Sequence, residues 1–476
     1  MLDPLKGYMK GALRRAKDAL VPDREMRAYE RWIRERQIAR REIYTHEPEP
    51  GLFSILTAVW DGSPVRYLRA LANRIAEQNA SGACEWVLLD NGCTKPEIRA
   101  YLHSLANLPW VKLVHGGTNL GITRGLRRCL EEARGRYVLP VDADDLLDRD
   151  ALRIVATAAA EHNYPALLYT DEDKIIGRRR YQPYRKPDWD PVLLLNSAYI
   201  AHLGVVDREK ALALGAYSDP AAEGSPDWDL FVRFLIAGHR AVHVPDIVYS
   251  WRVHAGSTAD DDARKPYIVN SQRAVLQRFL DSRPEGKLFE LEPSPLFAGG
   301  AHWHFRRKPS GRTPITIVRD PNTEQCAAAC RQSEFVCLLG TGIEIQRDDW
   351  QWEALGITEL HPDTAMIGGR IWNGRGELLE AGFNFDECGN CSNPHRGKPL
   401  TDPGYFGQLW KQRTVEAVST NFAVMRSQFL QDLLEKSPSL ENLDARAGLL
   451  AKQTNRRVVY SPFLGGLCRN DSASIS

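Results

Sequence analysis

Three carboxylates follow a short apolar run in the first third of the chain. The run is residues 137–141, and the acids are Asp142, Asp144 and Asp145. An apolar run of this length predicts a buried strand, and open α/β sheets bind ligands beyond the carboxyl ends of such strands. Asp142 and Asp144 could turn their oxygens toward one divalent cation, which needs only one or two carboxylates when it keeps water and substrate phosphates. The alternative is an acidic loop whose Asp148 caps the following helix.

A second group of metal-ligand residue types lies near the carboxyl-terminal end. Cys388, Cys391 and His395 resemble half of a zinc site, and Cys326 and Cys330 are the conceivable partners from another loop. A second pair at the usual zinc spacing is missing. Ordinary free thiols are the favoured interpretation.

The bulk composition is that of an ordinary globular protein. A chain of 476 residues exceeds a single core and predicts two or three domains. Its 62 basic and 61 acidic residues give a net charge of +1, so we expect no nucleic-acid partner. Nine irregularly placed cysteines, no signal peptide and no apolar run near a membrane-spanning length predict a cytoplasmic protein.

The amino-terminal region is expected to be helical and charged. Residues 1–22 alternate apolar and basic side chains near helical spacing, which predicts a basic amphipathic helix. Such a helix could contact the inner face of the cytoplasmic membrane as a peripheral anchor, or pack against the protein itself. Residues 24–46 continue as a charged helix that the Pro-rich stretch 46–51 ends. We therefore assign residues 1–50 to amino-terminal helices.

From residue 52 onward, strand-like and helix-like segments alternate. We expect strands over 52–60, 85–90, 110–115, 137–141, 166–169 and 241–244, and helices over 65–78, 121–133 and 226–237. This alternation predicts an α/β fold with a doubly wound, mostly parallel sheet. Asp90 and Asp142 then lie at the same edge of that sheet. Residues 281–313 are rich in Pro, Gly and Arg and predict a linker, so the domains are 51–280 and 314–476.

Four motifs occur in a characteristic order along the first domain. They are Thr57-Ala-Val-Trp60-Asp61, Asp90-Asn-Gly-Cys93, Asp142-Ala-Asp144-Asp145 and Glu223-Gly-Ser-Pro-Asp227-Trp-Asp229-Leu230. Together they resemble glycosyltransferase family 2, the inverting transferases with a GT-A fold. Stretches beginning at Tyr169, Lys186 and Trp251 resemble the subgroup that builds bacterial surface polysaccharides. The resemblance is close over 52–259 and loose over 314–466.

The resemblance implies a reaction and a set of site residues. A sugar would move from a nucleoside diphosphate sugar to a hydroxyl of a lipid-linked or glycan acceptor, such as a lipopolysaccharide core or O-antigen. Mn²⁺ or Mg²⁺ would neutralise the diphosphate, held by Asp144 with Asp142 and His254. Asp227 is implied as the general base, and burial or the nearby acids Glu223 and Asp229 would have to raise its pKa. Capping of its own helix is the alternative for Asp227, as a structural role is for His254.

The remaining implied contacts divide between the donor and the acceptor. Ala58, Trp60, Asp90, Asn91 and Asp142 are implied donor-nucleotide residues, whereas Glu223, Asp229, Arg252 and Arg127 are implied in the acceptor or diphosphate region. Asn91 stands where the family usually has a second acid, so the identity of the base stays open. Trp60 stands where Tyr is common and could stack on the base or pack in the core. Arg252 could instead bridge to a surface acid, and Arg127 could face solvent.

The second half of the chain resembles a degenerate copy of the first. Residues 335–350 resemble the metal-strand region, with Gly342 where the metal-binding Asp should stand. The segment from Leu440 to Asp444 resembles the base motif, with Asn442 in place of the acid. We predict a truncated, noncatalytic GT-A-like domain that binds acceptor, assembles with another glycosyltransferase or supports the first domain. The alternative is a second active site using Glu344, Asp348 and Asp349.

Two other functions compete with transfer. A noncatalytic scaffold in a glycan-assembly complex would fit the degenerate second half. A nucleotidylyltransferase shares a related sheet and metal carboxylates, but it requires a Gly-rich basic loop after the first strand, which residues 60–64 do not supply. Donor sugar, acceptor, linkage and oligomeric state are set by a few pocket residues and do not follow from the fold.

Overall fold

The computed structural model describes residues 24–79, 82–254, 266–297, 302–386 and 389–469. The chain divides into two compact units. Unit 1 runs to Trp189 and resumes over Ala198–Val275, and unit 2 consists of Asp190–Ser197 and Leu276–Ser476. The basic segment 1–22 lies outside the described residues. In the described part of the chain, every helix is too short or too polar to cross a lipid bilayer.

Unit 1 is built on one sheet with the strand order β3-β2-β1-β4-β8-β6-β9-β5, in which β7 also pairs with β6. The strands are β1 (Phe53–Val59), β2 (Cys84–Asp90), β3 (Val111–His115), β4 (Tyr137–Pro140), β5 (Leu146–Leu147), β6 (Leu167–Ile176), β7 (Arg179–Tyr184), β8 (Gly204–Asp207) and β9 (Val242–Arg252). The first four are parallel, and β8 runs antiparallel to both β4 and β6. The α/β fold predicted from the sequence is confirmed.

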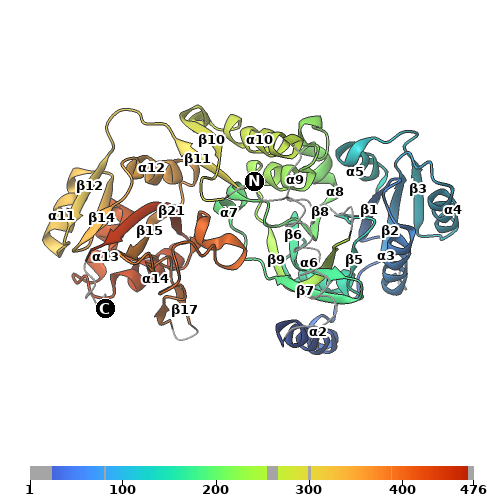
Figure 1. The fold of residues 1–476 in the computed structure, drawn as a ribbon, viewed down its shortest axis with the longest axis horizontal. Helices are drawn as coiled ribbons and strands as arrows, with labels where there is room; N and C mark the ends of the chain where they lie inside the picture. The colour runs from blue at the N-terminus through green and yellow to red at the C-terminus, as the bar shows by residue number, and fades with distance from the viewer. Residues whose placement is uncertain (1–23, 80–81, 255–265, 298–301, 387–388, 470–476) are drawn as a thin grey trace, which may run out of the picture. The chain divides into compact units, whose positions relative to one another are not determined.

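Helices flank the parallel half of this sheet. Those of unit 1 are α2 (Arg24–Ile43), α3 (Val65–Gln78), α4 (Pro96–Leu105), α5 (Gly121–Glu132), α6 (Ala151–Glu161), α8 (Arg208–Ala213) and α9 (Pro226–Ile236), and α10 (Pro266–Asp281) continues along the chain into unit 2. Figure 1 shows α3, α4 and α5 beside β1, β2 and β3. In α3, Leu68, Leu71, Ala72 and Ile75 are buried, which is the spacing of one helical face.

Helix α2 belongs to unit 1 and is held there by buried ion pairs. The Arg40 guanidinium has no solvent exposure and contacts Asp246 at 2.6 Å and Asp148 at 2.8 Å. Tyr29 donates its hydroxyl to Asp173 at 2.6 Å. Although burial opposes ionisation, Arg40 and Arg180 hold the pKa of Asp148 below its usual value. Asp148 therefore anchors α2, and Asp150 takes the N-cap position of α6.

Unit 2 contains a second mixed sheet with the order β12-β13-β20-β15-β21-β14, with β16 paired to β15 and β19 to β21. Its strands are β12 (Ile315–Arg319), β13 (Phe335–Leu339), β14 (Ile343–Ile345), β15 (Thr364–Asn373), β16 (Leu378–Glu380), β19 (Arg413–Val415), β20 (Phe422–Arg426) and β21 (Arg457–Cys468). Its helices are α7 (Pro191–Asn196), α11 (Thr323–Gln332), α12 (Trp350–Leu360), α13 (Ser427–Lys436) and α14 (Leu443–Gln453), with the 3-10 turn η4 (Tyr405–Trp410) and the small pair β17 (Asn384–Phe385) and β18 (Cys391–Ser392).

The strand order of unit 2 repeats that of unit 1. Reading β12-β13-β20-β15-β21-β14 against β1-β4-β8-β6-β9-β5, every corresponding pair of neighbours has the same parallel or antiparallel sense. The β16–β15 pair likewise corresponds to β7–β6. The order carries no strand beyond β12, so β2 and β3 have no counterpart among the described residues. Unit 2 is therefore a shortened version of the same topology.

The described residues of the segment predicted as a linker, 281–297 and 302–313, contain regular structure within unit 2. They include the 3-10 helix η3 (Pro284–Leu288) and an antiparallel pair, β10 (Phe289–Pro293) with β11 (Trp303–Arg307). Trp303 is buried, and His304 lies 2.8 Å from Glu353 on α12. Pro284 lies in η3 and Pro293 in β10, so composition alone did not distinguish these elements from a linker.

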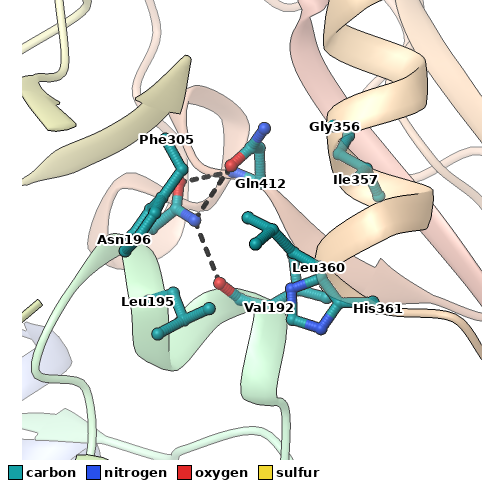
Figure 2. Close-up of a pocket in the computed structure, with 9 residues that line it drawn as sticks. All are labelled: Val192, Leu195, Asn196, Phe305, Gly356, Ile357, Leu360, His361 and Gln412. Atoms are coloured by element: carbon teal, nitrogen blue, oxygen red, sulfur yellow. Dashed lines mark hydrogen bonds between the residues drawn. The ribbon is translucent and has the colours of Figure 1, made fainter. Parts of the chain in front are cut away.

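Helix α7 interrupts unit 1 in the sequence and packs in the core of unit 2. All six of its residues are buried, and Asp190 caps it by accepting from the Val192 amide at 3.0 Å. Figure 2 shows the pocket beside this helix, where the Asn196 side chain donates to the Val192 carbonyl and to Gln412 Oε1. Gln412 in turn donates to Glu353, which joins α7 to the His304 pair.

Candidate active site

Asp145 fixes the acidic segment after β4 to strand β9. Tyr249 donates its hydroxyl to Asp145 Oδ2 at 2.5 Å, and the Arg252 backbone amide donates to Oδ1 at 2.7 Å. Burial and the charge of Asp142 raise the pKa of Asp145 well above its usual value. Because both its oxygens are engaged, Asp145 positions the two acids that precede it.

Asp144 lies in a small group with two residues predicted from the sequence, Arg252 and His254. His254 Nε2 is 2.7 Å from Asp144 Oδ2, and Arg252 Nε donates to the Asp144 carbonyl at 2.6 Å. Tyr67 of α3 covers both partners, with its ring centre 5.2 Å from that of His254 and 4.3 Å from the Arg252 guanidinium carbon. Tyr67 had no motif to mark it in the sequence.

Asp227 is the second residue of α9 and is partly buried. Burial raises its pKa to about 6, opposed by His202 and reinforced by the charges of Asp142 and Glu172. Asp142 is reached by solvent, yet burial and Asp144 raise its pKa as well, against the effect of His202. The charge of Asp142 thus acts on the proton affinity of Asp227. A carboxyl with a pKa of about 6 is ionised at neutral pH and still holds a proton more readily than an ordinary Asp, as a general base requires.

His202, just before β8, is a site residue that the sequence did not reveal. Its Nδ1 lies 3.4 Å from Glu172 Oε2, and its ring stacks on Tyr249 at 4.7 Å. Although burial favours the neutral ring, Glu172, Asp227 and Asp142 raise the pKa of His202 to about 10. A positive charge therefore stands among these acids at neutral pH. No motif marked His202, because it occurs within an apolar stretch.

The loop that carries His202 is held by a buried lysine. Lys186 donates to the backbone carbonyls of Thr170, Ile200 and His202 and lies 3.3 Å from Glu172. Burial lowers the pKa of Lys186, and Glu172 acts in the opposite direction. Glu172 and Lys186 lie in stretches that carried the resemblance to the polysaccharide subgroup, and that is the one signal that could have assigned them.

Three residues predicted in the acceptor or diphosphate region have structural partners within unit 1. Glu223 accepts from the Ile122 and Thr123 amides at 2.9 and 3.0 Å and so caps α5. Asp229 accepts from Arg233 at 2.6 Å, and Arg127 donates to Glu131 at 2.7 Å and to the Ala216 carbonyl. The acids that raise the pKa of Asp227 are Asp142 and Glu172, rather than Glu223 and Asp229 as expected.

The residues predicted to bind the donor nucleotide lie near the ends of β1 and β2. Ala58 is partly exposed on β1, and Trp60 just beyond it is 53% exposed, so Trp60 is not a core residue. Asp90 ends β2, where it accepts from the Cys93 amide at 2.8 Å. Asn91 is only 4% exposed; it accepts from the Leu120 amide and donates to the Gly121 carbonyl. Its amide thus holds the loop before α5, and the contact with a nucleobase stays a prediction.

The donor set after β4 is chemically suited to a hard divalent cation. Within the described residues, the ligand atoms of Asp142, Asp145 and His202 lie within 4.8 Å of one another. That trio is a poor ligand set as it stands, because Asp145 is fully hydrogen-bonded and a protonated His202 has no lone pair to offer. Asp144 and Asp142 supply carboxylate oxygens, and His254 an imidazole beside them, which fits Mn²⁺ or Mg²⁺.

The cysteines do not form a second metal site among the residues that the structure describes. Cys326 and Cys330 lie on the buried face of α11, and Cys391 is exposed on β18. Cys388 lies outside the described residues.

The counterpart positions in unit 2 follow from the shared strand register. Counted from the first residues of β4 and β13, Asp142 corresponds to Gly340 and Asp144 to Gly342, as the sequence predicted for Gly342. The position of Asp227, second in α9, corresponds to Asp444, second in α14. Asn442 is the N-cap residue, so the assignment of Asn442 to the base position was wrong and an acid is retained there.

Residues 54–206 match the family model described as Glycosyl transferase family 2. The uncharacterized protein y4gI of Sinorhizobium fredii is 26% identical over 462 residues, covering 83% of this chain and 50% of that protein. The O-antigen biosynthesis protein RfbC of Myxococcus xanthus is 29% identical over 241 residues, covering 49% of this chain and 19% of that protein. The amylovoran biosynthesis glycosyltransferase AmsE of Erwinia amylovora is 22% identical over 228 residues, covering 46% of this chain and 83% of that protein.

Solved structures show a more distant likeness. The structure of S. aureus TarS 1-349 in complex with UDP-GlcNAc has a TM-score of 0.40 and 20% identity, covering 48% of this chain and 66% of that chain. This chain therefore spans half the length of the y4gI protein and about two thirds of the TarS chain.

Proposed function

We propose, from the family 2 glycosyltransferase domain that residues 54–206 of this chain form, that unit 1 transfers a sugar from a nucleoside diphosphate sugar to a hydroxyl of a cell-surface glycan. The observation that carries the proposal is Asp227, a partly buried carboxyl with a pKa of about 6, placed in electrostatic contact with Asp142 of the acidic segment. The names of RfbC and AmsE, an O-antigen and an amylovoran biosynthesis protein, support a polysaccharide acceptor.

The donor half of the reaction is assigned to the residues after β4. Asp144, with Asp142 and His254, would hold the Mn²⁺ or Mg²⁺ ion whose charge neutralises the departing diphosphate. Arg252, whose Nε donates to the Asp144 carbonyl, would contact a phosphate oxygen. Trp60, exposed beyond the end of β1, would stack on the nucleobase, with Ala58 and Asp90 as the other proposed nucleotide contacts.

The acceptor half is assigned to Asp227. The acceptor oxygen attacks the anomeric carbon while Asp227 takes the hydroxyl proton, and the bond from that carbon to the diphosphate oxygen breaks with its electron pair on the diphosphate. One displacement of this kind inverts the anomeric configuration. His202, held by Glu172 and Lys186, keeps a positive charge between Asp142 and Asp227 and so limits the repulsion between these acids.

Donor binding by the full chain tests this proposal. Thermal unfolding is measured with a panel of nucleoside diphosphate sugars, with and without Mn²⁺. We expect one donor class to raise the midpoint only when Mn²⁺ is present, because ligand that binds the folded state alone stabilises it. The Asp144→Ala chain should lose this shift, and Glu97→Ala, an exposed acid of α4, should keep it.

The competing function is a noncatalytic scaffold for a partner transferase, which the shortened unit 2 favours. It predicts that Asp227→Asn leaves glycan assembly in cells intact. Loss of assembly in that variant, together with metal-dependent donor binding by the parent chain, excludes the scaffold. An absence of donor binding across the whole panel overturns the transferase.

A further inference from the structure

Unit 2 retains an acid where unit 1 has its proposed general base. Asp444 is partly exposed at the second position of α14, and its Oδ1 accepts from the Thr420 amide at 2.8 Å and from the Thr420 hydroxyl at 2.6 Å. Burial raises its pKa above the usual Asp value, although the hydrogen bonds from Thr420 oppose the shift. An exposed capping acid would show no such resistance to ionisation.

A second carboxyl, Glu380 of β16, interacts electrostatically with Asp444 and is almost completely buried, with 3% exposure. Its Oε1 accepts from the Asn421 amide at 3.2 Å, and its Oε2 has no donor within hydrogen-bond distance among the described residues. Burial raises the pKa of Glu380 to about 7 against the effect of the nearby Ser419 side chain, and the charge of Asp444 contributes. A buried carboxyl oxygen without a donor is an unusual feature in a folded protein, and a ligand hydroxyl would satisfy it.

The Asn421 amide, which donates to Glu380, stands where unit 1 has His202. In the strand register, Val138 pairs with Val206 as Val336 pairs with Met425, so Asn421 corresponds to His202. A Cβ on Gly340, the counterpart of Asp142, would lie 2.4 Å from Asn421 Oδ1. The Asn421 side chain thus occupies the space that an acid at position 340 would need.

Among the residues that the structure describes, unit 2 therefore lacks those proposed to bind the donor and keeps the acid at the base position. The described part of unit 2 has no acid at 340 or 342 and no counterpart of β2 and β3, so the features proposed to bind a metal and a nucleotide are missing. The carboxyl in the base position remains, next to a second carboxyl and an amide. In unit 1 that position meets the hydroxyl of the acceptor.

We propose that Glu380, Asp444 and Asn421 form a binding site for the hydroxyl groups of a glycan, in which no sugar is transferred. The inference rests on the proposed function, because that function identifies the base position with acceptor contact. Carboxylate oxygens accept hydrogen bonds from sugar hydroxyls, and the Asn421 amide can serve as donor and acceptor. The ligand class is therefore a neutral polyhydroxyl sugar, which needs neither metal nor nucleotide.

Binding of the full chain to an array of immobilised hexose and deoxyhexose oligosaccharides tests the site. Neither donor nor divalent metal is added, so no transfer occurs. We expect the parent chain to retain at least one glycan, and Glu380→Gln and Asp444→Asn each to weaken that retention about tenfold. Asp432→Asn, at an acid of α13 that accepts from the Gln428 side chain, is the matched control and should bind as the parent does.

Retention that is equal in the parent, Glu380→Gln and Asp444→Asn chains overturns the site, as does a parent chain that retains no glycan. Thermal unfolding checks that both variants fold; if one does not, the other carries the test. The donor screen of unit 1 reports on the proposed function separately. Glycan retention that depends on Glu380 without any donor binding overturns the transferase and leaves this site standing, whereas donor binding without such retention overturns this site alone.

Discussion

Units 1 and 2 share six strands in the same order and sense, yet their site residues differ at chosen positions. Asp142 and Asp144 of unit 1 become Gly340 and Gly342, while Asp227 has its counterpart in Asp444. Strands β2 and β3 occur in unit 1 alone. The comparison teaches that the same strand order can occur without the acids proposed to bind a metal. Function therefore has to be argued from side chains at particular positions rather than from the sheet.

The first test of the comparison removes the acid at the same helix position in each unit. Asp227→Asn should lower kcat for sugar transfer by about 10²–10⁴-fold, since removal of a general base has effects of that size. Asp444→Asn should leave kcat within about twofold, because the described part of unit 2 lacks the acids at 340 and 342. Initial rates of transfer to a glycan acceptor measure both.

Asp227→Asn should also raise the unfolding midpoint of unit 1. A carboxyl whose pKa is raised by burial to about 6 destabilises the folded protein at pH 7, and the amide does not. A variant that loses both activity and stability would point to unfolding rather than to the loss of a base.

The second test breaks the buried ion pair of unit 2. Glu353→Ala removes the buried partner of His304 and of Gln412 and Ser461, and should cost about 3 kcal/mol because His304 keeps only the partly exposed Glu292, at 3.2 Å, as its counterion. Glu334→Ala removes an exposed partner of Arg426 at 3.5 Å and should cost less than about 1 kcal/mol. Denaturant unfolding measures both, and donor binding by unit 1 should persist in each. Equal losses of unfolding free energy in the two variants would contradict the assignment of Glu353 as buried and Glu334 as exposed.

The third test uses the pH dependence of the same pair. The neighbours of His304, chiefly Glu353, raise its pKa to about 9 against the effect of burial. A raised folded-state pKa gives stability that is fully present below about 6.5 and is lost as the pH rises through about 9. The unfolding midpoint of unit 2 should therefore fall over this range, and His304→Gln should flatten the profile. In unit 1 the corresponding loss, at His202, should come nearer pH 10.

The smallest effect concerns the pH profile of transfer. Because Asp227 must be ionised to accept a proton, kcat/KM should rise with pH and level off above about 6, a change of roughly tenfold between pH 5 and pH 7. Asp444→Asn should leave the midpoint of this profile unchanged. A midpoint near 4 would show that Asp227 has the pKa of an ordinary Asp and is not tuned by its surroundings.

Local sequence signals predicted much of the frame. The periodicity of residues 65–78 gave helix α3 with its observed bounds, and the apolar runs gave β1 to β4 within one or two residues. The β6 and β9 strands extend well past the predicted 166–169 and 241–244, because they pair with each other and carry polar residues into the site. Pairing over such a separation in sequence leaves no local signal.

The site was predictable only where motif and geometry coincide. Asp144, Arg252 and His254 converge because β5, which follows the acidic segment, pairs with β9. Glu223, Asn91 and Arg127 are polar residues at suitable distances in sequence, but each is engaged by a neighbouring backbone group or side chain. His202 acquires its role from Glu172, Asp227 and Asp142, which no pattern around residue 202 records.

Helix α7 has a consequence for any attempt to divide this chain. Its six residues lie between β7 and β8 of unit 1 in sequence but are buried in unit 2. A chain cut after residue 275 would keep an apolar segment that has lost its packing partners, and a chain starting at 276 would lose the residues that pack beside Gln412. The two units are therefore interleaved along the chain, and we expect neither half to fold as an autonomous fragment.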